Sequence, residues 1–166
     1  TLATGNGGTG ATSFAPGKVL QVVSAQEGQV RSTTSGSFGA ISGVTLDITP
    51  SSTSSKVLVF FTLVLSCTNH GVIRFKRDST VIGAGITASG SRQDASMTSN
   101  SDGNTARPQT FNFLDSPSKS SATTYFAEWI ANSGSNAIYL NRTPNDTDAT
   151  YGSRFASTIT LMEIEG

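Results

Sequence analysis

The single cysteine and the single histidine of the chain lie three residues apart, a spacing at which they could form a nucleophilic pair. Such a pair requires both groups to converge on one site, together with a third residue that orients the base. Cys67, however, ends a long apolar run, which is the position of a small buried hydrophobe. His70 falls in the polar segment Thr68–Gly71, which is typical of a turn. The two residues also supply too few ligands for a structural zinc site.

Two polar segments have the composition of phosphate or ion sites, but each lacks essential features. The run Gly5–Gly10 has neither the Gly-Lys-Ser/Thr ending of a P-loop nor the strand-then-helix context. The segment Asn145-Asp146-Thr147-Asp148 alternates oxygen-bearing side chains, yet it lacks the glycine and the final glutamate of an EF-hand loop. We therefore expect no metal, no cofactor and no catalytic residue. A carboxylate pair of the glycosidase kind cannot be identified among the 11 acidic residues, although the sequence leaves that alternative open.

Aromatic side chains could stack on sugar rings, so their expected exposure matters. Trp129 and Tyr125 share one face of an apolar segment and are expected in the core. Tyr151 lies in the polar segment 142–153 and is the better candidate for an exposed contact.

The elements that would position these residues are short strands. The apolar run Lys56–Cys67 is bounded by Ser/Thr-rich turn material, which predicts a long buried strand. Strict alternation over Val44–Thr49 predicts a strand with Val44, Leu46 and Ile48 facing inward. Phe38–Ile41 is ambiguous. Further strands are expected at Lys18–Ala25, Val30–Thr34, Val72–Arg77, Thr80–Gly83, Gln109–Leu114, Ala122–Ala131, Ala137–Asn141 and Arg154–Glu165.

This pattern predicts an all-β chain, an antiparallel β-sandwich or jelly roll, with residues 18–166 as one domain and residues 1–17 as a Gly/Thr/Ser-rich linker. The polar segment 87–108 is either a functional loop or contains short strands. Three expected strands, including Lys56–Cys67 and Ala122–Ala131, are apolar on both faces. Their outer faces predict contact between subunits or cover by the linker, and we expect a homotrimer.

Composition narrows the range of partners. Formal net charge is zero and 13% of residues are charged, so no basic surface for nucleic acid is indicated. No apolar run approaches the roughly 20 residues of a membrane-spanning helix, and we expect no membrane insertion.

Several segments resemble those of a known class of proteins. Asn6-Gly7-Gly8-Thr9-Gly10-Ala11-Thr12-Ser13 resembles a motif of bacteriophage tail-fibre chains. The segments Gly17–Val23, Ile48–Val59 and Arg77–Gly83 are similar to C-terminal tip or head domains of fibre proteins from marine phages and cyanophages. The resemblance spans roughly the whole chain and implies a homotrimeric fibre tip. The implied head is a jelly roll of the tumour-necrosis-factor/C1q type, joined through the linker to the fibre shaft. It implies no particular functional residue.

We accordingly expect a non-enzymatic virion domain, in a tail or head fibre, that acts outside the cell by attaching to host glycan or lipopolysaccharide. Function on a rigid sandwich is usually carried by loops, here 87–108 and 142–153. The candidate receptor contacts are Arg92, Arg107, Asn145, Asp146, Asp148 and Tyr151. The alternatives are a purely structural trimerisation, head-fibre or capsid-decoration domain and, as a minor one, a glycan depolymerase.

Overall fold

The structure, a computed structural model, describes residues 18–86, 89–100, 105–131 and 136–166, so the expected linker lies outside the described residues. No helix occurs within these ranges. The strands are β1 (Val19–Glu27), β2 (Arg31–Thr33), β3 (Gly39–Ile48), β4 (Lys56–Cys67), β5 (His70–Arg77), β6 (Thr80–Ile82), β7 (Met97–Asn100), β8 (Arg107–Asp115), β9 (Thr123–Ala131), β10 (Ile138–Leu140) and β11 (Ser157–Ile164).

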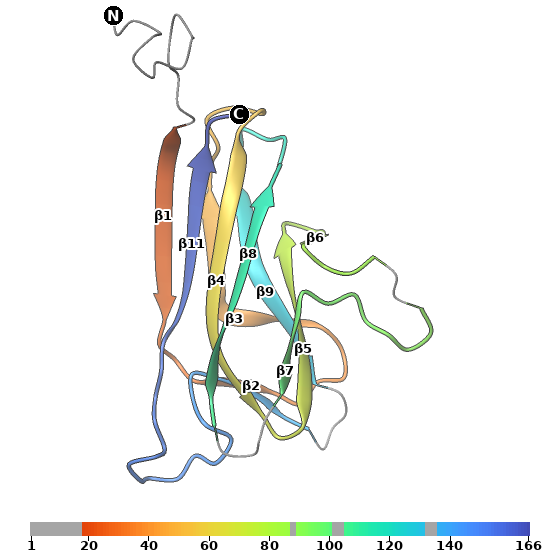
Figure 1. Ribbon diagram of the computed structural model, residues 1–166, viewed down its shortest axis with the longest axis vertical. Helices are drawn as coiled ribbons and strands as arrows, with labels where there is room; N and C mark the ends of the chain where they lie inside the picture. Colours follow the sequence, from red (N-terminus) through yellow and green to blue (C-terminus); the bar gives the residue numbers. More distant parts are fainter. Residues whose placement is uncertain (1–17, 87–88, 101–104, 132–135) are drawn as a thin grey trace, which may run out of the picture.

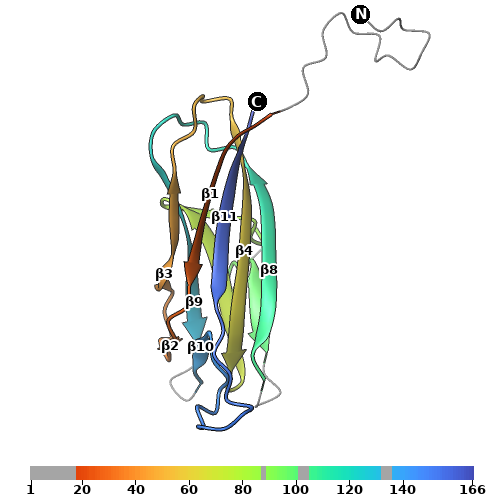
Figure 2. The ribbon, with the colours of Figure 1, turned by 90° about the vertical axis from the view of Figure 1, so that its left-hand side faces the viewer.

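The strands form two antiparallel sheets that pack face to face, which confirms the predicted β-sandwich (Figures 1 and 2). Sheet A has the order β1-β11-β4-β10-β2, with β8 paired to the other edge of β4. Sheet B has the order β3-β9-β5-β6, and β7 also pairs with β5. The long strands run along the long axis of the molecule, so its two ends are formed by turns and loops.

Strand β4 is the centre of sheet A, as the apolar run Lys56–Cys67 predicted. It pairs with β8 along one edge and with β11 and then β10 along the other. Its odd-numbered residues, from Val57 to Cys67, are buried between the sheets. Because every second residue of a strand faces the same side, the even-numbered residues form the outer face of the sheet.

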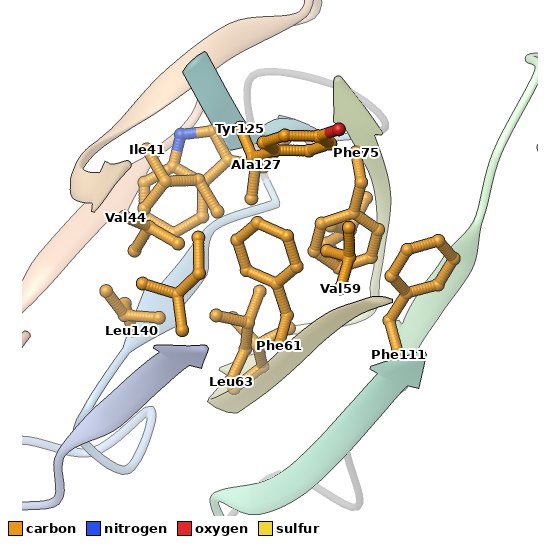
Figure 3. Packing of buried hydrophobic residues seen from close by; sticks show 14 of the residues in the cluster. Ile41, Val44, Val59, Phe61, Leu63, Phe75, Phe111, Tyr125, Ala127 and Leu140 are labelled. Atoms are coloured by element: carbon orange, nitrogen blue, oxygen red, sulfur yellow. The ribbon is translucent and has the colours of Figure 1, made fainter. Parts of the chain in front are cut away.

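The core between the sheets is apolar and contains a row of phenylalanine rings (Figure 3). The ring centroids of Phe61 and Phe75 are 4.5 Å apart, and those of Phe75 and Phe111 are 4.2 Å apart. The predicted inward residues Val44 and Ile48 belong to this core. These tilted and stacked pairs join β4 and β8 of sheet A to β5 of sheet B.

Two segments that were ambiguous in the sequence form strands. Residues 39–48 are one strand, because the register with β9 shifts between Ala40 and Thr45 and lets the chain continue. Gly43 lies within this shift at φ 82°, and a Cβ atom there would collide with the Glu27 side chain. Within 87–108, residues Met97–Asn100 form β7, which confirms that this segment contains a short strand.

The outer face of sheet B is partly covered by charged side chains of its own strands. On β9, Glu128 forms an ion pair with Arg74 at 2.6 Å and another with Lys76 at 3.6 Å. The Lys76 ammonium lies 5.5 Å from the Phe126 ring centroid. Long charged side chains therefore cover part of the apolar outer face of Ala122–Ala131 with their stems.

Candidate functional site

The two ends of the sandwich differ in what they present. At one end β1 begins and β11 ends, beside the turn at residues 51–55 (Figure 1). At the opposite end lies the loop between β10 and β11, residues 141–156, which we call the distal loop. The entry point of the domain at Val19 is thus separated from the distal loop by the full length of the strands.

The distal loop is closed at its base by Asn141. This buried residue adopts φ 62°, a conformation that asparagine tolerates better than most residues. Its side-chain amide donates to the carbonyls of Glu27 at 2.7 Å and Gln29 at 3.0 Å. Its amide oxygen accepts from the Ser157 hydroxyl at 2.7 Å, and its carbonyl accepts from the N–H of Phe155. One residue therefore holds together the β1–β2 turn and both ends of the loop.

Three charged side chains of the distal loop, Arg142, Asp146 and Arg154, are paired with one another. Asp146 contacts Arg154 at 2.5 Å and Arg142 at 3.8 Å. The Arg142 guanidinium also stacks 3.9 Å from the Tyr139 ring centroid and donates to the carbonyl of Pro144 at 3.1 Å. These contacts fix the loop conformation and place each arginine beside a carboxylate.

The tip of the distal loop exposes an aromatic ring. Tyr151 is 68% exposed, which confirms the exposure predicted for it. It lies within a tight turn in which the Gly152 N–H donates to the Ala149 carbonyl at 2.8 Å. A side chain at Gly152 would collide with the Thr147 carbonyl oxygen, so glycine is required beside this tyrosine. Asp148 is exposed on the same turn.

The structure brings together five of the six predicted contact residues. Asn145, Asp146, Asp148 and Tyr151 share the distal loop. Arg107 begins β8 at the same end, where it is registered with Leu65. Arg92 lies apart from them, in the loop between β6 and β7 on the side of the molecule. This side loop comprises residues 83–96. Residues 87 and 88 of it, and residues 101–104 of the predicted loop 87–108, are outside the described residues.

The outer face of sheet A carries an apolar row that crosses four strands. The register places Val22 opposite Met162, Met162 opposite Leu58, and Leu58 opposite Leu114. Val22 is 54% exposed and Leu114 is 49% exposed. Val19, Phe60 and Ile164 extend the row on the same face. We call these seven residues the outer patch: Val19, Val22, Leu58, Phe60, Leu114, Met162 and Ile164.

The outer patch ends where the distal loop begins to cover β4. Val64, although it faces outward, is 7% exposed, and the Ser66 hydroxyl donates to the Arg142 carbonyl at 2.7 Å. The two-sided character of β4 predicted from the sequence therefore has two explanations. The half of β4 near Cys67 is covered by its own chain, and the half near Lys56 is open.

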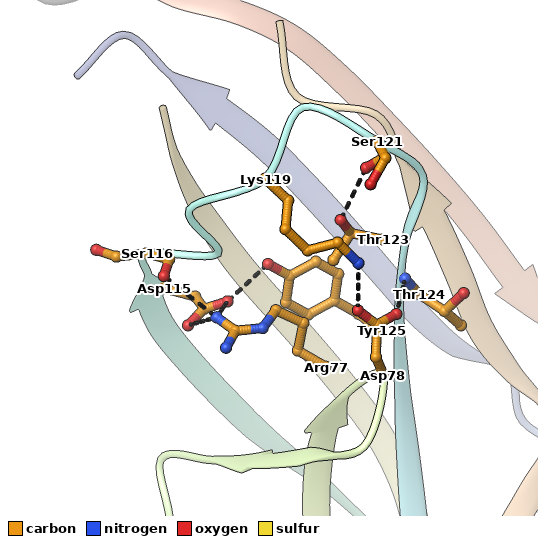
Figure 4. Close-up of polar contacts among 9 residues, drawn as sticks. All are labelled: Arg77, Asp78, Asp115, Ser116, Lys119, Ser121, Thr123, Thr124 and Tyr125. Atoms are coloured by element: carbon orange, nitrogen blue, oxygen red, sulfur yellow. Dashed lines mark hydrogen bonds and ion pairs between the residues drawn. The ribbon is translucent and has the colours of Figure 1, made fainter. Parts of the chain in front are cut away.

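A buried polar cluster lies beside the open edge of the sandwich (Figure 4). Asp115 is 6% exposed and accepts hydrogen bonds from Arg77 Nη1 at 2.9 and 2.8 Å and from the Tyr125 hydroxyl at 2.7 Å. Burial, and then the Asp115 carboxylate, raise the pKa of Tyr125. The phenol therefore remains a hydrogen-bond donor and holds the carboxylate in place.

A second carboxylate of the cluster anchors the β5–β6 turn. Asp78, at φ 50°, accepts from Lys119 Nζ at 2.7 Å and from the Thr124 N–H at 3.0 Å. The Lys119 contact, followed by the Thr124 N–H, lowers the pKa of Asp78. Together with Arg77, this pairing fixes the segment between β8 and β9.

Cys67 and His70, which were considered as a nucleophilic pair, each contact other groups. Cys67 is buried, its sulfur donates to the Ser99 carbonyl at 3.2 Å, and burial raises the pKa of its thiol. His70 begins β5, where its Nδ1 lies 3.1 Å from the Asn69 side-chain oxygen. Among the described residues, no three His, Cys, Asp or Glu side chains form a group that could hold a metal ion.

Comparison with known proteins gives no family assignment. No protein-family model matches the chain, and no curated protein matches it either. Within the described ranges, no helix has the length and apolar character needed to cross a membrane. The function that this chain supports must therefore be argued from its own residues and geometry.

Proposed function

We propose that this chain is the distal domain of a bacteriophage fibre, which assembles as a homotrimer and attaches the virion to a glycan or lipopolysaccharide of the host surface. The observation that carries the proposal is the difference between the two ends of the sandwich. The domain is entered at Val19, at one end, and presents the distal loop with exposed Tyr151 at the other. A fibre tip requires this separation of attachment and recognition.

The strand pairing supports a jelly-roll head. The first strand pairs with the last, and further pairs nest inside: β1 with β11, β3 with β9, β4 with β8, and β5 with β6. Such nesting is what results when one long antiparallel ribbon is wrapped into two sheets, as in jelly rolls.

The outer patch supports self-association. Its residues lie on one continuous face of sheet A, beside polar positions such as Asn112 and Thr160. Copies that pack this face around an axis parallel to the strands would gather all entry points at one end and all distal loops at the other. In an assembly with closed cyclic symmetry, each copy buries this face against the other copies. The fibre resemblance gives three as the number of copies. Three sites would also raise avidity without strong single-site affinity.

The chemistry of the distal loop suits glycan contact. Tyr151 offers an exposed ring and a hydroxyl, while Asp148 offers acceptor oxygens, on a turn held by backbone hydrogen bonds. An aromatic ring with a polar tip supplies contact area at low conformational cost. The internal pairing of Asp146 with two arginines keeps the loop from acting as a general anion-binding surface.

Cell adsorption tests this proposal. Fluorescently labelled full chain is incubated with a panel of marine Gram-negative bacteria and cyanobacteria, and with their purified lipopolysaccharide. We expect saturable binding to at least one strain, weakened about tenfold or more by Tyr151→Ala because a central aromatic contact is lost. Thr53→Ala, in the exposed turn at the other end, is the matched control and should bind like the parent.

A second candidate is a purely structural trimerisation domain, favoured by the mutual pairing of Arg142, Asp146 and Arg154. In that case the chain would form the trimer and adsorb to none of the strains. Equal adsorption by the parent and Tyr151→Ala would also contradict our assignment of the distal loop.

A further inference from the structure

A hollow of about 530 Å³ opens at the edge of the sandwich between β6 and β8. Residues 80–86 contribute one wall, Phe113 and Asp115 of β8 contribute another, and Arg77 and Asp94 complete the lining. We call this hollow the edge pocket. Its volume falls within the roughly 300–1,000 Å³ that is usual for small-molecule sites. None of the residues predicted as receptor contacts lines it.

The edge pocket contains the Arg77 guanidinium, which has N–H donors that no described residue engages. Arg77 uses Nη1 alone to contact both oxygens of Asp115 and the Ser116 carbonyl. Within the described part of the chain, no hydrogen bond engages its Nε or Nη2, and its side chain is 18% exposed. Figure 4 shows the second terminal nitrogen directed away from the carboxylate. The N–H groups on this side of the guanidinium are therefore available to a ligand.

Charge and lining narrow the class of ligand. Asp115 already compensates Arg77, and Asp94 adds a further carboxylate, so the edge pocket carries no excess positive charge that would attract a free anion. Asp94 and the Thr80 hydroxyl supply acceptors, while Val81, Ile82 and Phe113 supply apolar surface. A ligand that matches both must donate and accept hydrogen bonds and also present an apolar face. A neutral pyranose ring has these properties.

The Arg77–Asp115 pair of the edge pocket is held in place before any ligand arrives. The Tyr125 hydroxyl and Arg77 fix Asp115 from two directions, and the Gly85 N–H donates to the Ala95 carbonyl at 3.2 Å. Preorganisation of this kind lowers the entropic cost of binding. We infer that the edge pocket binds a neutral sugar unit of a surface glycan, as a contact separate from and additional to the distal loop; the glycan source rests on the proposed function.

The test is a titration of the isotopically labelled full chain by NMR. The probes are neutral hexoses, 6-deoxyhexoses and N-acetylhexosamines, with galacturonate as the charged comparison. We expect weak, saturable shifts confined to Arg77, residues 83–85 and Phe113, with at least one neutral sugar binding better than galacturonate. Gly85→Trp should abolish the shifts, because a Cβ atom at Gly85 meets no neighbour and the indole would occupy the edge pocket.

Two variants accompany that measurement. Gly28→Trp introduces the same side chain at a glycine whose Cβ would also lie in open space, outside the edge pocket, and should bind like the parent. Asp94→Asn changes an exposed residue and should weaken binding several-fold while the fold remains intact.

The inference is overturned if no neutral sugar shifts these resonances, or if only galacturonate does. It is overturned equally if Gly85→Trp lowers the mass of the oligomer and leaves sugar binding unchanged, since the edge pocket would then be a contact between copies. Sugar binding in a chain that adsorbs to no cell supports this inference and contradicts the proposed function. Adsorption without sugar binding contradicts this inference alone.

Discussion

Asp115 and Asp146 show how differently one kind of residue contributes at two places in this molecule. Both pair with arginine, but Asp115 is 6% exposed whereas the side chains of Asp146 and Arg154 are 45% and 53% exposed. A buried charge that loses its partner has neither water nor a counterion, whereas an exposed pair is solvated whether or not it forms. Stability should therefore depend on Asp115 far more than on Asp146.

We predict that Asp115→Asn destabilises the fold by about 3 kcal/mol, because it leaves the largely buried Arg77 without its counterion. Asp146→Asn is the matched control and should cost less than about 1 kcal/mol. Urea unfolding followed by tryptophan fluorescence measures both. A loss of similar size in the two variants would contradict the structural role given to Asp115.

Glu163 is a buried carboxylate whose protonation should weaken the fold. The residue is 2% exposed, and both the N–H and the hydroxyl of Ser51 donate to its Oε1, at 2.7 and 2.6 Å. Burial raises the pKa of Glu163, but the Ser51 hydrogen bonds outweigh it and leave this pKa below its usual value. Since the folded pKa is lower than the unfolded one, the stabilisation is present above about pH 4.3 and is lost as the pH falls through the folded pKa.

We predict that Glu163→Gln loses stability at pH 6 and that its deficit relative to the parent shrinks towards pH 3. Unfolding curves at several pH values measure the difference. Glu165→Gln, in an exposed pair with Lys18 at 4.0 Å, should show a small difference that hardly changes over this range. A deficit for Glu163→Gln that grows with acidity would show that the sign is wrong.

Among the elements, the distal loop depends on one side chain at its base. Asn141 joins the β1–β2 turn to both ends of the loop, so the orientation of Tyr151 depends on a residue ten positions earlier. Removing the amide leaves several buried partners unsatisfied, which costs more than the net energy of the hydrogen bonds themselves.

We predict that Asn141→Ala costs about 2–3 kcal/mol and speeds hydrogen exchange at Phe155, whose N–H donates to the residue 141 carbonyl. Thr53→Ala, in the exposed turn at the other end of the sandwich, should change stability by no more than about 0.5 kcal/mol. Unchanged exchange at Phe155 would mean that the loop does not depend on this anchor.

The long strands could be predicted from the sequence, because apolar runs and alternation are local. Strand β4 was predicted with the bounds observed, Lys56–Cys67. What covers an outer face could not be predicted, since it depends on register between strands distant in sequence. Glu128 meets Arg74 and Lys76 only in the folded sheet, and the row from Val22 to Leu114 joins residues from four strands. Arg92 was grouped with the distal loop residues by composition alone, whereas the fold separates them.

At the scale of the whole molecule, the chain combines a closed core, a distal loop and an open apolar face. The outer patch is left uncovered by the residues that the structure describes, and contiguous apolar surface of this kind marks an interaction site. Our central claim is that further copies of the chain cover it. A change confined to the outer patch should then separate the copies without unfolding them.

Sedimentation velocity of the full chain over micromolar concentrations tests this claim most directly. We predict a species with three times the 17.2 kDa mass of the chain. Leu114→Lys should convert it to a folded monomer, because a charge would be buried in the interface beside Leu58. Thr45→Lys, on the exposed outer face of sheet B, should leave the trimer intact. A parent chain whose sedimentation corresponds to a mass of 17.2 kDa throughout this concentration range would contradict the account.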